Sequence, residues 1–211
     1  MTHQIKCATF TLSNNSNSLI LAGNQKFGRG ISVGILDLQN SELTKEIKSD
    51  MNLSYGGPPA FIALTPDEHF AIVGCTSGGA TTYVVFDLTT SQELVQSPSI
   101  IIDGEARSSL VLNNDEVVSG TRNGQLIIWN ILSCQRVHSL TDNGQNPHRD
   151  RITDLRLSPE RNCFVSASFD GTAKIWDSHS KQLISRLIGH KREVNESLHS
   201  SSQYFILSND I

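Results

Sequence analysis

The chain has 211 residues, of which 37% are hydrophobic and 18% are charged, and its formal net charge is −4 at pH 7. This composition is typical of a soluble globular protein with a sizeable core. The mildly acidic balance gives no general reason to expect nucleic acid as a partner, and no apolar run approaches the roughly 18 residues of a membrane span. Because the N-terminus also lacks the features of a signal peptide, we expect a cytoplasmic or nuclear protein.

The predicted elements are short strands throughout. In chain order, β-branched and apolar runs lie at 18–23, 69–75, 81–88, 116–121, 125–132, 152–157, 163–168 and 172–177. Gly, Asn, Asp, Ser and Pro separate these runs, which is the pattern of an all-β protein. No window of helical length shows a period near 3.6, so we expect no substantial helix.

Several of these strands belong to an internal repeat. Segments 116–130 and 163–177 align without a gap, pairing Ser119 with Ser166, Asn123 with Asp170, Gly124 with Gly171, Trp129 with Trp176 and Asn130 with Asp177. More diverged copies lie at 19–37 and 70–87. The two aligned segments begin 47 residues apart, and a repeat of this length indicates an architecture such as a propeller.

The repeat resembles the WD-repeat β-propeller family. One unit carries His148, Ser166, the turn Asp170-Gly171 and Trp176 followed by Asp, although Pro147 stands where the family usually has Gly. The resemblance spans the whole chain and implies four-stranded antiparallel blades, about 4–8 of which close around a channel.

The resemblance also implies where the blades lie. We expect blades at about 3–47, 58–100, 101–142 and 148–188, and half a blade at about 190–211. About four and a half blades make an incomplete propeller, so we expect the chain to be part of a larger protein, a truncated gene product or the product of an incomplete gene model.

Ser166, His148 and Asp170 also suggest an alternative, a nucleophile with its base and orienting acid. A catalytic serine must be exposed beside an oxyanion hole, whereas Ser166 lies in an apolar strand without a nucleophile-elbow pattern. In the family that the chain resembles, His, Asp, Ser and Trp form a hydrogen-bonded chain that ties the loop before a blade to its inner strands. We therefore expect His148, Ser166, Asp170 and Trp176 to form a structural hydrogen-bond set.

Other chemistry-bearing residues form no recognisable constellation. The four cysteines are spread along the chain without a C-x-x-C pair, which predicts free thiols rather than structural zinc. The remaining histidines have no metal-ligand spacing, and the glycine-rich stretches 24–30 and 76–82 match no phosphate-binding motif. We expect no catalytic site, no cofactor and no metal.

The family resemblance implies a non-catalytic scaffold or adaptor that binds other proteins or peptides through propeller loops. The alternative is a substrate receptor of a cullin-type ubiquitin ligase. Members of that subgroup carry Trp-Asp-x-Arg, whereas the sequences here are WDSH at 176–179 and WNIL at 129–132. The missing arginine argues against the alternative.

Loops expected at one end of the ring form a local positive patch in an otherwise acidic chain. This candidate partner-binding face consists of Arg122, Arg149, Arg151, Phe169, Lys191 and Arg192. It predicts a docking site for an acidic or phosphorylated segment, with arginines paired to carboxylate or phosphate and the aromatic ring as an apolar anchor. The alternative is that these are ordinary solvated loop charges. The loop that precedes blade four, 141–151, is longer than its equivalent and is expected to project.

Overall fold

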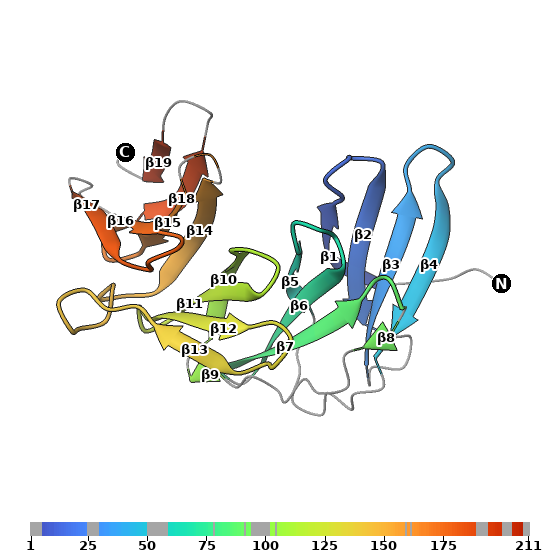
Figure 1. Ribbon diagram of the computed structural model, residues 1–211, viewed down its shortest axis with the longest axis horizontal. Coiled ribbons are helices and arrows are strands. Elements are labelled where there is room, and N and C mark those ends of the chain that lie inside the picture. Colours follow the sequence, from blue (N-terminus) through green and yellow to red (C-terminus); the bar gives the residue numbers. More distant parts are fainter. Residues whose placement is uncertain are drawn as a thin grey trace. The chain divides into compact units, whose positions relative to one another are not determined.

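The computed structural model describes residues 6–24, 30–49, 59–77, 79–90, 92–93, 102–103, 105–158, 160, 162–188, 194–199 and 204–208. The regular elements of this part of the chain are antiparallel β-strands (Figure 1), which confirms the all-β prediction. No helix among the described residues is long and apolar enough to cross a membrane. The chain divides into two compact units, residues 1–103 with 131–134, and residues 104–130 with 135–211.

The first unit contains two sheets. The first sheet has the order β1 (Lys6–Leu12), β2 (Ser18–Asn24), β3 (Ile31–Asp37) and β4 (Glu42–Lys48). The second has the order β5 (Pro59–Leu64), β6 (Phe70–Ser77), β7 (Ala80–Asp87) and β8 (Gln92–Glu93), and β9 (Ile102–Asp103) also pairs with β7.

The outer strand of the second sheet is formed by two pieces. β8 pairs with the end of β7 at Asp87, and β9 pairs with its start at Ala80. Since β6 pairs along the whole of β7, both pieces occupy the other edge. The second sheet therefore reaches Asp103, beyond the expected boundary near residue 100.

The second unit contains three sheets. One has the order β10 (Ala106–Val111), β11 (Glu116–Thr121), β12 (Leu126–Asn130) and β13 (Arg136–Ser139). The next has the order β14 (Ile152–Ser158), β15 (Cys163–Ser168), β16 (Thr172–Asp177) and β17 (Leu183–Ile188). The last pairs β18 (Val194–His199) with β19 (Tyr204–Ser208).

All five sheets repeat one irregularity. The register between the first two strands shifts at Cys7/Thr9, Pro59/Phe61, Ala106/Ser108, Ile152/Asp154 and Val194/Glu196. A bulge at a fixed place bends and twists the strand in the same way each time. The repeat seen in the sequence is thus also a repeat of backbone geometry.

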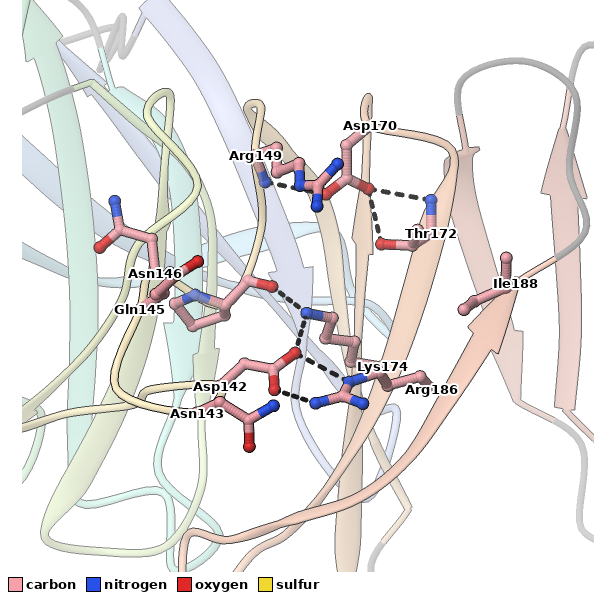
Figure 2. Close-up of a pocket in the computed structure, with 11 residues that line it drawn as sticks. Asp142, Asn143, Gln145, Asn146, Arg149, Asp170, Thr172, Lys174, Arg186 and Ile188 are labelled. Atoms are coloured by element: carbon pink, nitrogen blue, oxygen red, sulfur yellow. Dashed lines mark hydrogen bonds and ion pairs between the residues drawn. The ribbon is translucent and has the colours of Figure 1, made fainter.

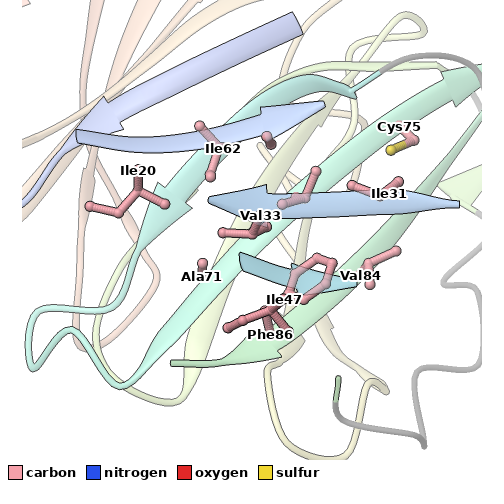
Figure 3. Close-up of a cluster of buried hydrophobic side chains, with 11 residues drawn as sticks. Ile20, Ile31, Val33, Ile47, Ile62, Ala71, Cys75, Val84 and Phe86 are labelled. Carbon is pink, nitrogen blue, oxygen red and sulfur yellow. The ribbon is translucent and has the colours of Figure 1, made fainter. Parts of the chain in front are cut away.

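In each unit the core lies between neighbouring sheets. In the first unit, one face of the first sheet packs on the second sheet through Ile20, Ala22, Ile31, Val33, Ile47, Ile62, Ala71, Val73, Cys75, Val84 and Phe86 (Figure 3). In the second unit, the third and fourth sheets share a core of Leu112, Val118, Leu126, Ile128, Leu140, Ile152, Leu155, Phe164 and Trp176. β15 is buried at every position, whereas the outer strand β17 alternates between half-buried and exposed. Coverage on both faces explains why the inner strands are continuously apolar or small.

Candidate functional site

A continuous chain of hydrogen bonds crosses the fourth sheet. Trp176 donates its Nε1–H to Ser166 Oγ at 2.9 Å, and this oxygen lies 2.8 Å from His148 Nε2. The other ring nitrogen, His148 Nδ1, lies 3.1 Å from Asp170 Oδ2. Because an indole only donates and a carboxylate only accepts, the bonds run in one direction, from Trp176 to Asp170. The structure thus brings together all four residues of the expected hydrogen-bond set.

This chain of hydrogen bonds lies in the protein interior. Ser166 and Trp176 are 0% exposed and His148 is 2% exposed. A substrate therefore cannot reach the Ser166 hydroxyl, whose oxygen also accepts the N–H of Trp176. This arrangement suits a structural tie rather than a nucleophile.

Asp170 connects the hydrogen-bond chain to the loop before β14. Its carboxylate accepts hydrogen bonds from Thr172 N at 2.9 Å, from Thr172 Oγ1 at 2.6 Å and from Arg149 N at 2.9 Å. Burial raises the pKa of Asp170, but the hydrogen bonds from His148, Thr172 and Arg149 outweigh burial and hold this pKa well below its usual range. The group is therefore a carboxylate at neutral pH, and it fixes the backbone of Arg149 against the β15–β16 turn.

The third sheet contains a shorter version of the same hydrogen-bond chain. Trp129 Nε1 donates to Ser119 Oγ at 3.0 Å, and the hydroxyl of Ser109 lies 3.2 Å from the same oxygen. Ser109 is the cross-strand partner of Ser119 and was not predicted from the sequence. Its position opposite Ser119 depends on the register of β10 and β11, which the sequence pattern alone did not specify.

The loop between the third and fourth sheets contains a tight hairpin. Asp142 and Gln145 exchange backbone hydrogen bonds, and between them Asn143 and Gly144 have φ values of 53° and 78°. Two consecutive positive φ values are typical of a type I′ turn, for which Asn-Gly is the preferred sequence. The hairpin tip is exposed, and its base is attached to the fourth sheet.

Asp142 makes that attachment. Its Oδ2 lies 2.5 Å from Lys174 Nζ, and Arg186 approaches both carboxylate oxygens, with Nε 2.9 Å from Oδ2 and Nη2 bonded to Oδ1 (Figure 2). The ammonium of Lys174 also donates to the carbonyl oxygen of Pro147. Hydrogen bonds from Arg186 and then from Lys174 hold the pKa of Asp142 well below its usual range, despite the opposing effect of burial. The hairpin is thus held by two cations that share one carboxylate.

This cluster was not predicted from the sequence. Lys174 is 8% exposed and pairs across the strands with Ser166 on one side and Arg186 on the other. The available indication was its position two residues before Trp176, because a strand period of two places both side chains on one face. Asp142 carried no comparable indication, since it reaches Lys174 only through the loop conformation.

Three comparisons with known proteins agree with this architecture. Residues 135–177 match the family model "WD domain, G-beta repeat". The structure of U3-55K has the same fold, with a TM-score of 0.64 at 16% sequence identity, over 92% of this chain and 55% of that chain. Eukaryotic translation initiation factor 3 subunit I of Bombyx mori is 28% identical over 168 residues, which cover 74% of this chain and 47% of that protein. Together these comparisons support a WD-repeat β-propeller family for this chain.

The described residues therefore form WD-repeat blades: four blades of four strands, with the outer strand of blade two in two pieces, and two strands of a fifth. Shorter matches occur to the same subunit of Anopheles gambiae, at 36% identity over 67 residues, and of Drosophila ananassae, at 39% over 67 residues. These cover 32% of this chain and 19% and 20% of those proteins. The chain spans about half the length of the Bombyx mori relative.

Four residues of the candidate partner-binding face, Arg122, Arg149, Arg151 and Phe169, lie on loops of blades three and four. The guanidinium carbon of Arg151 lies 3.9 Å from the centre of the Phe169 ring, a cation–π contact. Arg122 Nη1 lies 3.7 Å from Glu105 Oε2, and the exposed Arg149 has no ion-pair partner in the part of the chain that the structure describes.

Lys191 and Arg192 lie outside the described residues. Asp150 lies between the two arginines of the loop into blade four and accepts a hydrogen bond from the backbone nitrogen of Arg151. Among the described residues, no group of three or more His, Cys, Asp or Glu side chains could hold a metal ion.

A pocket of about 560 Å³ opens beside the hairpin in the second unit. It is lined by the hairpin residues on one side and by Thr172, Lys174, Arg186 and Ile188 of β16 and β17 on the other (Figure 2). Arg149 lines the same pocket. The walls carry hydrogen-bonding and charged groups, which suits recognition of a polar partner rather than of an apolar small molecule.

Proposed function

We propose that this chain is a non-catalytic protein-interaction module whose rigid blades present loops to other proteins. WD-repeat proteins act as protein-interaction scaffolds. The observation that carries the proposal is the burial of Ser166: the expected Ser-His-Asp set is satisfied internally and holds a binding loop in place. The polar chemistry of blade four therefore serves to position the loop.

The proposed partner is an acidic or phosphorylated protein segment that docks on the loops of blades three and four. Arg151 lies on the Phe169 ring, which orients its guanidinium and leaves its N–H edges able to pair with carboxylate or phosphate. Arg149 is exposed, and its backbone is fixed by Asp170. Lys191 and Arg192 remain predicted members of this face.

The relatives suggest the setting of this interaction. The relatives of Bombyx mori, Anopheles gambiae and Drosophila ananassae are each named as subunit I of eukaryotic translation initiation factor 3. We therefore propose that the chain works in the cytoplasm as one subunit of a multisubunit assembly. No finding supports a cullin-type receptor, and the Trp-Asp-x-Arg sequence of that subgroup is absent at 176–179.

Co-purification tests this function. Full-length tagged protein is purified from its own cells, the partners are identified, and the affinity of each is measured for wild type and for Arg122→Glu/Arg151→Glu. We expect the charge reversals to lower the affinity for the docking partner about tenfold at low salt, equivalent to about 1.4 kcal/mol. The loss of affinity should be smaller at high salt, where exposed charges are screened.

The matched control is Lys48→Glu/Arg136→Glu, which makes the same change in net charge at exposed positions outside the loops. We expect this control to retain the partner. Equal effects of the two double variants, or less than a twofold effect of the loop variant at low salt, would contradict docking on these loops.

A further inference from the structure

The outer strand of blade four has an unusual exposed face. β17 is the last strand of its sheet, so its outer edge pairs with no strand among the described residues. Ile184, Arg186 and Ile188 stand at alternate positions, and the two isoleucines are 57% and 78% exposed. On β4, the outer strand of blade one, the exposed residues are Glu42, Thr44 and Lys48. Polar and charged residues are the usual protection of a free edge, and β17 lacks much of it.

A groove runs along this strand. A second pocket, of about 600 Å³, is lined by Ile184, Arg186 and Ile188 on one side and by Thr141, Asp142 and Asn143 on the other. It shares Asp142, Asn143, Arg186 and Ile188 with the pocket beside the hairpin, so the two are continuous. We call this continuous hollow the rim groove. The hairpin forms one wall and β17 the other.

The charge of the rim groove is unbalanced at its centre. Lys174 and Arg186 share the single carboxylate of Asp142. The other charged groups that line the groove, Arg149 and Asp170, are of opposite sign and offset each other. Arg186 contacts this carboxylate through Nε and Nη2, and within the described residues its Nη1 has no partner. A guanidinium has five N–H donors, so Arg186 can bind a second carboxylate without releasing Asp142. An incoming acidic side chain would balance the second cation.

We propose that the rim groove binds an extended segment of a partner protein, which adds as a further strand to the free edge of β17. Residues directly opposite each other on paired strands contact one another. An added strand would therefore place apolar side chains against Ile184 and Ile188 and an acidic side chain against Arg186. The segment recognised is apolar-x-acidic-x-apolar, a pattern that is the same in either chain direction. Strand addition supplies main-chain hydrogen bonds, and alternate side chains supply specificity.

This proposal rests on the proposed function as a protein-interaction module and adds a second surface, separate from Arg122 and Arg151. The probe is a fluorescent heptapeptide of threonine with valine at its second and sixth positions and glutamate at its fourth. Its affinity for the full chain is measured by anisotropy. We expect it to bind about tenfold more tightly than the same peptide with lysine at the fourth position.

Protein variants locate the binding. Ile184→Ser/Ile188→Ser should lower the affinity for the glutamate peptide about tenfold, whereas Val137→Ser should leave this affinity unchanged. Val137 is the matched control, because it lies on β13, the outer strand of blade three, and is 56% exposed. Unfolding curves should be the same for all three proteins, since the substituted side chains are exposed.

Peptide variants test the backbone pairing on wild-type protein alone. A strand that adds to an edge directs every second N–H toward that edge. N-methylation of the peptide amides that face β17 should therefore abolish binding, whereas N-methylation of the amides that face away should not. The proposal is overturned if the glutamate peptide does not bind, if its lysine counterpart binds equally, or if Val137→Ser weakens it as much as the groove variant. It is also overturned if both methylated peptides bind. Because no native partner is used, such failure would leave docking on the loops standing.

Discussion

The hydroxyl of Ser166 joins the apolar and charged ends of the hydrogen-bond chain in blade four. Trp176 can only donate and Asp170 can only accept, whereas Ser166 and His148 can each do both. The four groups are therefore satisfied only together and in one direction. Removing one partner leaves a buried polar group without its bond, which costs roughly 1–3 kcal/mol.

Asp170→Asn should lower the free energy of unfolding at pH 7 by about 1–3 kcal/mol. It should also make the free energy of unfolding less dependent on pH in the acid range. The pKa of Asp170 is lowered in the folded protein, so its stabilisation is fully present above the unfolded value of about 3.9 and is lost as the pH falls toward the folded value. The gap between wild type and variant, measured by urea unfolding at several pH values, should therefore narrow below about pH 4.

The control for this substitution is Asp115→Asn in the exposed turn before β11, which should change stability little at any pH. Other carboxylates titrate equally in wild type and variant, so only the difference between them reports on Asp170. A gap that stays constant from pH 7 to acid would show that the charge of Asp170 contributes nothing.

At the scale of elements, the loop that precedes blade four is held to blade three by backbone contacts and to blade four by side chains. The backbone nitrogen of His148 donates to the carbonyl oxygen of Gly124, in the β11–β12 turn. Gly124 has φ 78°, and a Cβ there would clash with the carbonyl oxygen of His148. Asp142 adds the second attachment through Lys174 and Arg186. The loop is therefore fixed at both ends.

Asp142→Ala should destabilise the protein by about 3 kcal/mol, because the nearly buried ammonium of Lys174 loses its carboxylate. Asp142→Ala/Lys174→Met should be less destabilised than Asp142→Ala alone, since the unpaired charge is gone. Chemical denaturation of the two variants and of Lys174→Met completes the cycle. Additive losses would mean that the two groups do not interact.

At the scale of the whole molecule, both units are built by stacking one apolar sheet face on the next. In the first unit, blade one uses one face for this purpose. Its other face carries Phe10 and Leu12, which are 65% and 50% exposed and pair across the strands with the half-buried Leu21 and Leu19. Large exposed apolar groups on one sheet face promote association.

Phe10→Ser/Leu12→Ser should reduce self-association of the purified chain. The wild-type chain should show a weight-average mass that rises with concentration in light scattering, and the variant should remain closer to a monomer. Stability should change little, because the substituted side chains are already exposed. A wild-type chain that stays monomeric at every concentration tested would contradict this expectation.

Much of the fold could be predicted because it depends on local chemistry. Short β-branched runs ended by Gly, Asn and Asp predict strands and turns, and Asp170-Gly171 predicts the β15–β16 turn, in which Gly171 adopts a φ of 79°. The resemblance to the WD-repeat family implied that His148, Ser166 and Trp176 lie together, and in the structure they are joined by hydrogen bonds.

The parts that the sequence did not predict depend on pairing between distant segments. The contact of Asp142 with Lys174 and Arg186 requires the register of β16 with β17 and the conformation of the hairpin. The division of the outer strand of blade two into β8 and β9 likewise depends on which edge of β7 is free. By itself, the sequence determined the all-β class and the repeat, because periodicity and turn chemistry are local, and the family resemblance implied the hydrogen-bonded residues of blade four. Only the tertiary structure decided which charges meet and which strand edge stays open, because a buried charge and a free edge are defined by neighbours far away along the chain.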